Sequence, residues 1–338
     1  MHKNDDYKGV WILAEQSAGR VLRVSYELLT RGRELADKRK TDLTAIIFGA
    51  AFDDCDLQQL IECGADSIIA VEAKQLEHFD VEPYSACMLK LIAEKKPEII
   101  IAAATTTGRT LMPYVAIKAD TGLTADCTVL DIEPQTGNLL QTRPAIGGNI
   151  MATIKTPNHR PQMATVRPRS TKPAERKADR TGQITRINAS SDTLTTRAKF
   201  LGFNPDESEH GLQDADIIVA AGRGVKKATG VETVKTLCEK LDGALGASRD
   251  VVDRGWLSYP HQIGLSGKTV SPKLYVACGI SGAIQHLAGM QTSENIVAIN
   301  TDPDAQIFRV ADLGIVGNIF EVLPVICEKL DALKRGEK

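Results

Sequence analysis

Residues 274–302, LYVACGISGAIQHLAGMQTSENIVAINTD, decide the fold because they read as strand, glycine turn, helix and strand. Residues 274–278 and 296–299 are continuous apolar runs, as expected for parallel strands that are covered on both faces. Gly279 and Gly282 allow a sharp turn after the first strand. The stretch therefore predicts a parallel βαβ unit.

The turn in this unit predicts a site for an anion. Ser281 is expected to cap the start of the helix, which Gly289 ends. A helix that begins at the carboxyl edge of a parallel sheet presents free N–H groups and the positive end of its dipole. A nucleotide phosphate is the expected ligand at such an edge.

The whole chain has the composition of a soluble globular protein. It has 338 residues, with 43% hydrophobic and 25% charged residues, which predicts two domains, residues 1–200 and 205–338. The formal net charge of −2 argues against a nucleic-acid partner. No apolar run is long enough to span a bilayer, so no membrane insertion is expected.

The cysteines and histidines indicate the cellular compartment and whether the chain has a metal site. The chain contains seven cysteines without a CxxC pair, and its start lacks the layout of a signal or transit peptide. Free thiols in a reducing compartment are expected, and hence a cytoplasmic protein. The six histidines show no metal-ligand spacing, so no metal site is predicted.

The first domain is predicted to be an open, doubly wound parallel α/β sheet. Expected strands at 9–15, 43–48, 67–71 and 98–103 alternate with helices at 18–38, 57–63, 83–94 and 108–119. Four short extended runs follow, at 127–132, 139–144, 149–156 and 162–167. Turn signals, including Gly147-Gly148, separate them. These runs predict an antiparallel excursion from the sheet.

Polar segments are expected to connect the two domains. Residues 167–180, RPRSTKPAERKADR, predict a surface arm because this composition cannot bury a core. Residues 184–187 and the polar stretch after them are expected to lead out of the first domain. Pro205 and the acidic run 206–209 mark the entry to the second.

The second domain repeats the α/β alternation and places polar groups at strand ends. Strands are expected at 216–221, 244–247, 274–278, 296–299 and 313–316, with helices at 229–241 and 319–333. Glycines, serines and arginines follow the first three of these strands. Glycines let the backbone approach phosphates, and arginine supplies a forked cation. Several polar strand ends on one edge favour an extended ligand such as a dinucleotide, although no GxGxxG motif is present.

Several motifs resemble one known family. The run LYVACGISGAIQHLAG, followed six residues later by IVAIN, is similar to the signature of the electron transfer flavoprotein alpha subunit. The resemblance continues through ALGASRDVVDRGW (244–256), QIGLSGKTVSPKLY (262–275) and DPDAQIFRVADLGIVG (302–317). In the first domain it includes TGLTADCT (121–128) and RPAIGGN (143–149), so it covers nearly the whole chain.

The resemblance implies a Rossmann-like second domain that binds FAD, and a heterodimer with a beta subunit. It implies FAD-binding roles for Arg223, Ser248, Arg249, Gln262, Ile263, Gly264, Leu265, Ser266, Ser281, Gly282, Ala283, Ile284, Gln285, His286, Asn300, Asp302, Asn318 and Ile319. Arg249, Ser266 and His286 are expected nearest the flavin ring, where cations and donors favour the negative charge of reduced flavin. Asn300 and Asn318 are expected on the adenosine side.

The implied function is that of an electron carrier rather than a stand-alone enzyme. The heterodimer would take electrons from an acyl-CoA dehydrogenase, as in fatty acid β-oxidation, or from another dehydrogenase, and pass them to an acceptor. Some anaerobic members bifurcate electrons from NADH. Two alternatives stay open from the residues alone: an NAD-dependent oxidoreductase domain, and a non-redox nucleotide-binding scaffold.

Overall fold

The computed structural model describes residues 6–145, 150–202, 211–212 and 215–335. The chain divides into two compact units, residues 1–201 and 202–338, and each is described by itself. The Gly147-Gly148 turn, Pro205 and the acidic run 206–209 lie outside the described residues.

The first unit is built on a seven-stranded parallel sheet of order β12-β5-β4-β1-β6-β11-β7. All residues of β1 and β6 are apolar and buried, as expected for strands of a parallel sheet that is covered on both faces. The strands are β1 (Val10–Ala14), β4 (Leu43–Gly49), β5 (Ser67–Glu72), β6 (Ile99–Ala103), β7 (Leu123–Cys127), β11 (Gln162–Val166) and β12 (Gln183–Asn188).

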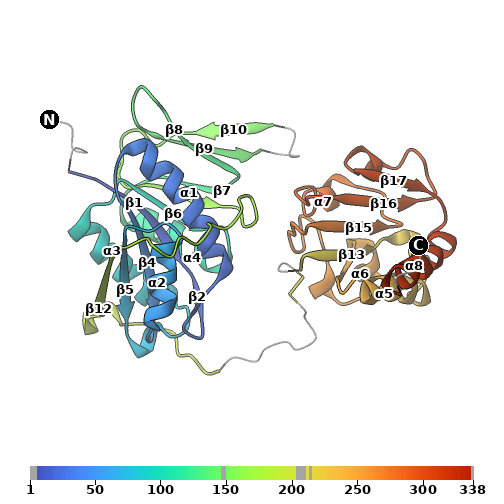
Figure 1. Ribbon diagram of the computed structural model, residues 1–338, viewed down its shortest axis with the longest axis horizontal. Coiled ribbons are helices and arrows are strands. Elements are labelled where there is room, and N and C mark those ends of the chain that lie inside the picture. Colours follow the sequence, from blue (N-terminus) through green and yellow to red (C-terminus); the bar gives the residue numbers. More distant parts are fainter. Residues whose placement is uncertain (1–5, 146–149, 203–210, 213–214, 336–338) are drawn as a thin grey trace. The chain divides into compact units, whose positions relative to one another are not determined.

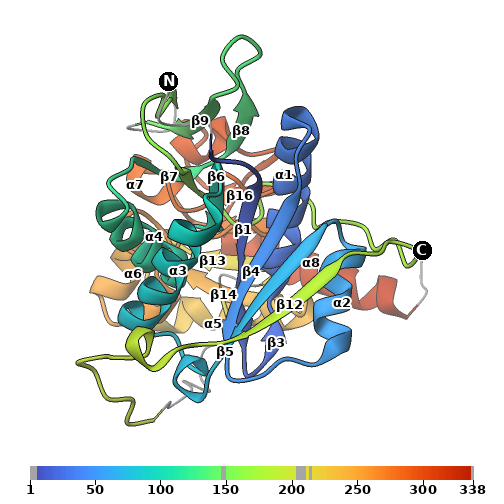
Figure 2. The same ribbon diagram turned by 90° about the vertical axis from the view of Figure 1, so that its left-hand side faces the viewer.

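Helices cover both faces of this sheet, so the predicted doubly wound fold is confirmed. Leucines of α1 (Arg23–Arg39) and α2 (Asp54–Glu62) pack on one face. Side chains of α3 (Val81–Lys95) and α4 (Thr106–Lys118) pack on the other (Figure 2). A short hairpin of β2 (Gln16–Ser17) and β3 (Arg20–Val21) precedes α1, which therefore starts later than predicted.

The predicted antiparallel excursion is present but shorter than expected. Strands β8 (Val129–Ile132), β9 (Leu139–Pro144) and β10 (Met151–Ile154) form an antiparallel sheet. The fourth run was wrongly assigned to it, because residues 162–166 form β11, a parallel strand between β6 and β7. All of β11 is buried, so its burial beside two long-range partners decides its place in the large sheet.

The segments after β11 stay attached to the first unit. Residues 183–188 form β12, which extends the sheet beside β5, so the prediction that 184–187 lead out of the domain was wrong. The arm 167–180 lies on the surface, as expected, but ion pairs hold it. Nη2 of Arg180 lies 2.7 Å from Oδ1 of Asp66, and Arg176 pairs with Glu62.

The second unit contains a five-stranded parallel sheet of order β14-β13-β15-β16-β17 (Figure 1). Its strands are β13 (Ile217–Ala221), β14 (Ala244–Ala247), β15 (Leu274–Cys278), β16 (Ile296–Asn300) and β17 (Leu313–Val316). The order reverses beside β13, where β14 lies on one side and β15 on the other. Ligands bind at the carboxyl ends of strands at such a switch point.

Apolar side chains fix the layers around this sheet. Helices α5 (Ala228–Lys240), α6 (Arg249–Asp253) and α8 (Ile319–Lys334) contribute to the core on one face. The opposite face is packed by the loop residues Ile263 and Met290 and by Ile307, which lies in the 3-10 helix Gln306–Arg309. The predicted strands and the two long helices of this domain are confirmed. The helix α7 (Ile284–Leu287) is only one turn long.

Candidate functional site

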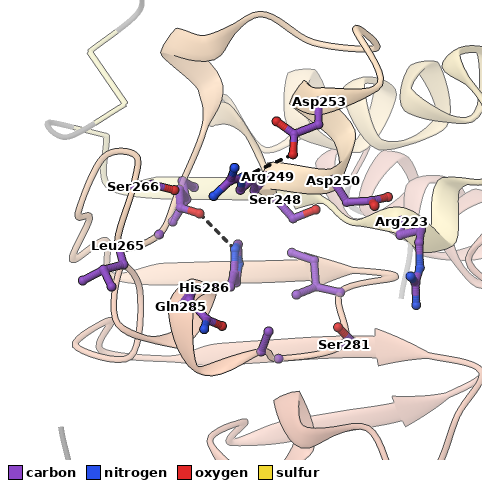
Figure 3. Close-up of a pocket in the computed structure, with 15 residues that line it drawn as sticks. Arg223, Ser248, Arg249, Asp250, Asp253, Leu265, Ser266, Ser281, Gln285 and His286 are labelled. Atoms are coloured by element: carbon purple, nitrogen blue, oxygen red, sulfur yellow. Dashed lines mark hydrogen bonds and ion pairs between the residues drawn. The ribbon is translucent and has the colours of Figure 1, made fainter. Parts of the chain in front are cut away.

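A cavity of about 520 Å³ lies at the carboxyl ends of β13, β14 and β15. Its volume is in the range of small-molecule and cofactor sites. The loops after β13 and β15, the start of α6, the loop 263–266 and α7 supply its walls (Figure 3). The lining residues are Arg223, Ser248, Arg249, Asp250, Asp253, Ile263, Gly264, Leu265, Ser266, Ile280, Ser281, Gly282, Ala283, Gln285 and His286.

Glycines allow the loops of this cavity to pack backbone against backbone. A Cβ at Gly222 would lie 2.3 Å from the carbonyl oxygen of Gly279. Gly282 has a φ of +84°, and a Cβ there would lie 2.2 Å from the amide nitrogen of Ile307. A side chain at Gly222 would separate the loops after β13 and β15, and one at Gly282 would push the turn after β15 away from the segment that contains Ile307.

Two cations and two carboxylates give the cavity its charge. Arg223 follows β13 and has no ion pair with any described residue. Arg249 begins α6, and its Nε lies 3.2 Å from Oδ2 of Asp253. Asp250 pairs instead with Arg254, at 2.9 Å. The unpaired guanidinium of Arg223 is suited to an anionic group such as a phosphate.

His286 is the buried polar group of the cavity wall. Its Nε2 lies 2.9 Å from the hydroxyl of Tyr275, and its Nδ1 lies 3.1 Å from the carbonyl oxygen of Ile263. Burial lowers the pKa of His286 to about 4, although the Ile263 contact opposes that change. The imidazole is therefore neutral at ordinary pH.

Residues 263–266, in the segment that follows α6, form another wall of the cavity, and hydrogen bonds from Gln262 and Tyr259 stabilise this loop. Gln262 is buried, and its amide donates to the carbonyl oxygen of Ser266 at 3.0 Å and to the Ser266 hydroxyl at 3.1 Å. The hydroxyl of Tyr259 donates to the same carbonyl oxygen. Leu265 is 75% exposed. Gln262 thus supports the loop without lining the cavity, while Leu265 and Ser266 line it.

The structure brings most of the predicted site residues together, but it places six of them outside the cavity lining. These are Gln262, Ile284, Asn300, Asp302, Asn318 and Ile319. The Asn300 amide donates to the carbonyl oxygen of Ile280, and its oxygen accepts from the amide of Asp302. Asn318 caps α8, since its oxygen accepts from Phe320, and Ile319 is buried in the core. Ile284 is exposed on α7.

The expected helix cap at Ser281 was wrong. Helix α7 has Ala283 at its N-cap position, without a side-chain cap. Ser281 lies two residues earlier, in the turn that Gly282 bends toward the segment containing Ile307. The backbone carbonyl of Ser281 accepts a hydrogen bond from the amide of Ile307 at 3.1 Å, which ties the turn to that segment.

Sequence reasoning missed Ile280, Asp250 and Asp253 as lining residues. Asp253 follows Arg249 by four residues, and this spacing places the two side chains on the same face of a helix. That signal was available in the sequence. Ile280 is nearly fully buried between two glycines, and nothing in its residue type indicates that it lines a cavity.

Comparison with known families matches both units. Residues 10–192 match the electron transfer flavoprotein domain, and residues 211–291 match the electron transfer flavoprotein FAD-binding domain. The chain belongs to the electron transfer flavoprotein alpha subunit family.

Curated relatives are similar along nearly the whole chain. An electron transfer flavoprotein subunit alpha from Thermoanaerobacterium thermosaccharolyticum is 47% identical, over 98% of this chain and 100% of the relative. An acryloyl-CoA reductase electron transfer subunit beta from Anaerotignum propionicum is 39% identical, over 98% and 97%. A lactate dehydrogenase (NAD(+),ferredoxin) subunit LctC from Acetobacterium woodii is 38% identical, over 96% and 77%.

Family membership confirms the FAD prediction and the beta subunit as partner. The cavity suits such a cofactor. It combines an arginine without an ion pair among the described residues, closely packed glycine loops and a lining that runs from Arg223 to Leu265. The two alternatives, an NAD-dependent oxidoreductase domain and a non-redox scaffold, are not supported. None of the helices in the described ranges is long and apolar enough to cross a membrane.

Proposed function

We propose that the cavity of the second unit holds the FAD, with its diphosphate at the Arg223 side. Arg223 and the turn 280–283 supply the cation and the backbone groups for this part. In Figure 3, Arg223 and Ser281 lie toward one side, while Leu265 and Ser266 lie toward the other. The flavin ring would occupy the part bounded by Arg249, Ser266 and His286.

Bound FAD supplies a carrier that exchanges electrons with two different partners. The protein contributes binding, charge and exclusion of water. Arg249 places a positive charge where a reduced ring is negative, and Asp253 moderates it at 3.2 Å. Gln262 keeps the Ser266 hydroxyl in place through its 3.1 Å hydrogen bond. The single observation that carries this assignment is Arg223, which lines the switch-point cavity and has no ion pair with any described residue.

The electron donor is proposed to be a dehydrogenase of the acyl-CoA class. The acryloyl-CoA reductase electron transfer subunit, 39% identical to this chain, supports a redox partner that acts on acyl-CoA compounds. The heterodimer would then receive electrons from acyl-CoA oxidation, as in fatty acid β-oxidation, and pass them to a separate acceptor. Location in the cytoplasm stays a prediction from the cysteine pattern.

The test is to produce the chain with its beta subunit and record the visible spectrum of the purified complex. A flavin band, and its bleaching by an acyl-CoA substrate with the matching dehydrogenase, are expected. A complex that stays free of flavin after incubation with FAD would refute the site. A flavin that no acyl-CoA dehydrogenase reduces would refute the donor class alone.

Electron bifurcation from NADH is a second candidate function. The relative that is named as part of an NAD(+),ferredoxin lactate dehydrogenase favours it. The expected sign is two FAD molecules per heterodimer, together with reduction of ferredoxin by NADH only when a high-potential acceptor is also present. One FAD per heterodimer and no such coupling would leave simple electron carriage as the function.

A further inference from the structure

Residues 196–200 cross the start of helix α3 at the end of the first unit. They follow β12 and lie just before residue 201, where the first unit ends. Asp80 is the N-cap of α3, and its Oδ1 accepts a hydrogen bond from the amide of Glu82 at 3.1 Å. Its other oxygen, Oδ2, accepts one from the hydroxyl of Thr196 at 2.5 Å. The residue that caps the helix therefore also holds the segment 196–200, which is called the strap.

Glu82, in the first turn of α3, holds the strap at a second point. Its Oε2 accepts a hydrogen bond from the backbone amide of Arg197 at 2.7 Å, and its Oε1 accepts one from Nε of the same residue at 2.7 Å. The hydrogen bond from the Arg197 side chain is the main reason that the pKa of Glu82 is below its ordinary value. The carboxylate is charged at neutral pH, so both hydrogen bonds are charge-assisted.

Phe200, at the end of the strap, contacts His78. The two rings are stacked, with centroids 3.9 Å apart and planes inclined by 21°. Phe200 is nevertheless 57% exposed. Before the strap, Thr193 is buried and Leu194 packs against the core of the first unit. Directional contacts at the surface therefore hold the strap, whereas the core holds the chain before it.

The strap determines where the connection to the second unit begins. Leu212, twelve residues after Phe200, is buried in the core of the second unit. Twelve fully extended residues span at most about 40 Å. If the strap detached, the connection would begin after Leu194, and its eighteen residues would span at most about 60 Å. The docked strap thus removes about a third of the length that the chain would otherwise allow.

We propose that the strap is an anchor that fixes the start of this connection at Phe200 and so limits how far the second unit can separate from the first. Connection length matters for a carrier that exchanges electrons with two partners. A longer connection extends the reach of a tethered unit but lowers its effective concentration beside the other unit. The inference goes beyond the proposed function, because it concerns residues of the first unit and does not depend on where FAD binds.

Thr196→Val, Arg197→Ala and Phe200→Ala, combined in one variant, remove the side-chain contacts of the strap. None of these three side chains is buried, so the core of the first unit stays intact. Arg20→Ala is the matched control. Arg20 also forms an exposed ion pair in the first unit, 3.5 Å from Asp56, and the control removes the same charge without touching the strap.

Hydrogen exchange of the full heterodimer measures whether the strap is docked. In the wild type, the amide of residue 197 should be protected, because it donates to Glu82. In the triple variant this amide should exchange about tenfold faster, although its acceptor is unchanged, because the contacts around it are lost. The control should exchange like the wild type. A wild-type amide that exchanges as fast as in an unfolded peptide would overturn the proposal, even if the variant does not fold.

The distance between the two units supplies the second readout. Spin labels are attached at Cys55 on α2, which is exposed, and at Lys329→Cys on α8, with a beta subunit that has no accessible cysteine. The other six cysteines of this chain are buried. Pulsed electron paramagnetic resonance should show distances up to about 20 Å beyond the wild-type maximum in the triple variant, and none in the control.

Two results in the triple variant would overturn the proposal. Exchange of residue 197 at the wild-type rate would mean that these contacts do not hold the strap. Fast exchange with unchanged distances would mean that the strap does not limit the separation of the units. Neither readout requires FAD, so a heterodimer without flavin would refute the proposed function and not this inference.

Discussion

Nε of Arg249 lies 3.2 Å from Oδ2 of Asp253, one turn later on α6, and both side chains line the cavity. This pair reduces the positive charge that Arg249 presents to a ligand. The side chains are 70% and 62% exposed, so water screens the interaction and its contribution is small.

Asp253→Asn should raise the flavin midpoint potential, because the carboxylate that offsets Arg249 is gone. An exposed pair of about 0.2–1 kcal/mol corresponds to a shift of about 10–40 mV for one electron. Arg249→Ala should move the potential in the opposite direction. Spectroelectrochemical titration of the heterodimer measures both potentials.

Asp242→Asn is the control for these two variants. Asp242 does not line this cavity, and its φ of 51° is one that Asn tolerates. Shifts of the same sign in Asp253→Asn and Arg249→Ala would contradict this account.

Arg223→Ala should weaken FAD binding about tenfold, because Arg223 is the cation proposed for the diphosphate. The loss should shrink as salt concentration rises, since ionic screening already weakens the wild-type contact. Equilibrium dialysis of the heterodimer against FAD at two salt concentrations is the measurement. Lys226→Ala removes a nearby positive charge that does not line the cavity, and it should bind FAD like the wild type. Equal losses in both variants would mean that only net charge matters.

Glu15→Gln should remove a pH dependence of stability that comes from the first unit. Glu15 is buried at the end of β1, and the Thr105 hydroxyl donates to it at 2.6 Å. Burial raises its pKa to about 7, against the opposing effect of Thr105. Between the unfolded value of 4.5 and 7 the folded state binds more protons, so the free energy of unfolding falls as pH rises through this window.

Urea unfolding of the full chain at pH 5 and pH 7 measures this difference. In the wild type, Glu15 should lower the free energy of unfolding at pH 7, relative to pH 5, by on the order of 1–3 kcal/mol. Glu15→Gln should lack this decrease. Thr105→Val should preserve the sign, because burial and not the hydroxyl raises the pKa. An identical difference between pH 5 and 7 in the wild type and in Glu15→Gln would show that Glu15 ionises normally.

His286→Gln should reveal a dependence of the opposite sign. The pKa of His286 is lowered to about 4 by burial, so between 4 and its unfolded value of 6.5 the unfolded state binds more protons. The free energy of unfolding therefore rises with pH in that window for the wild type. The variant should lack this rise. The Glu15 and His286 effects overlap in pH and have opposite signs, so each must be measured in its own single variant. If the free energy of unfolding of His286→Gln depended on pH as in the wild type, His286 would not be a buried neutral imidazole.

Asp66→Asn should loosen the arm 167–180 and destabilise the first unit. Oδ1 of Asp66 lies 2.7 Å from Nη2 of Arg180, and Oδ2 lies 2.7 Å from Nη1 of Arg33. Burial opposes ionisation, but the Leu43 amide and the two arginines hold the pKa of Asp66 below its ordinary value. We expect a loss of about 1–3 kcal/mol at pH 7. Trypsin should also cleave within 167–180 faster than in the wild type. Cleavage at the wild-type rate would show that the other ion pairs hold the arm without Asp66.

Much of the second domain could be predicted from the sequence because its signals are local. The strand β15 is a short apolar run between polar residues, and glycine-rich turns follow β13 and β15. The resemblance to the electron transfer flavoprotein alpha subunit, and not the loop pattern, grouped Arg223, Ser266 and His286 at one cofactor, and all three line one cavity. A parallel sheet brings its carboxyl ends to one edge, so strand order alone makes such loops converge.

The rest depended on contacts between distant segments. The place of β11 is set by β6 and β7 on its two sides, and its own residues do not distinguish a parallel from an antiparallel strand. Helix α7 is one turn long because the turn at Gly282 packs against Ile307, far along the chain. The neutral state of His286 follows from its burial. Its ring is positioned by contacts with Tyr275 and Ile263, which no sequence pattern reveals.

The most direct measurement is an experimental structure of the heterodimer with bound FAD. The account predicts cofactor density in the cavity of the second unit, with the diphosphate beside Arg223 and the ring bounded by Arg249, Ser266 and His286. An empty cavity in a complex that carries flavin elsewhere would contradict it.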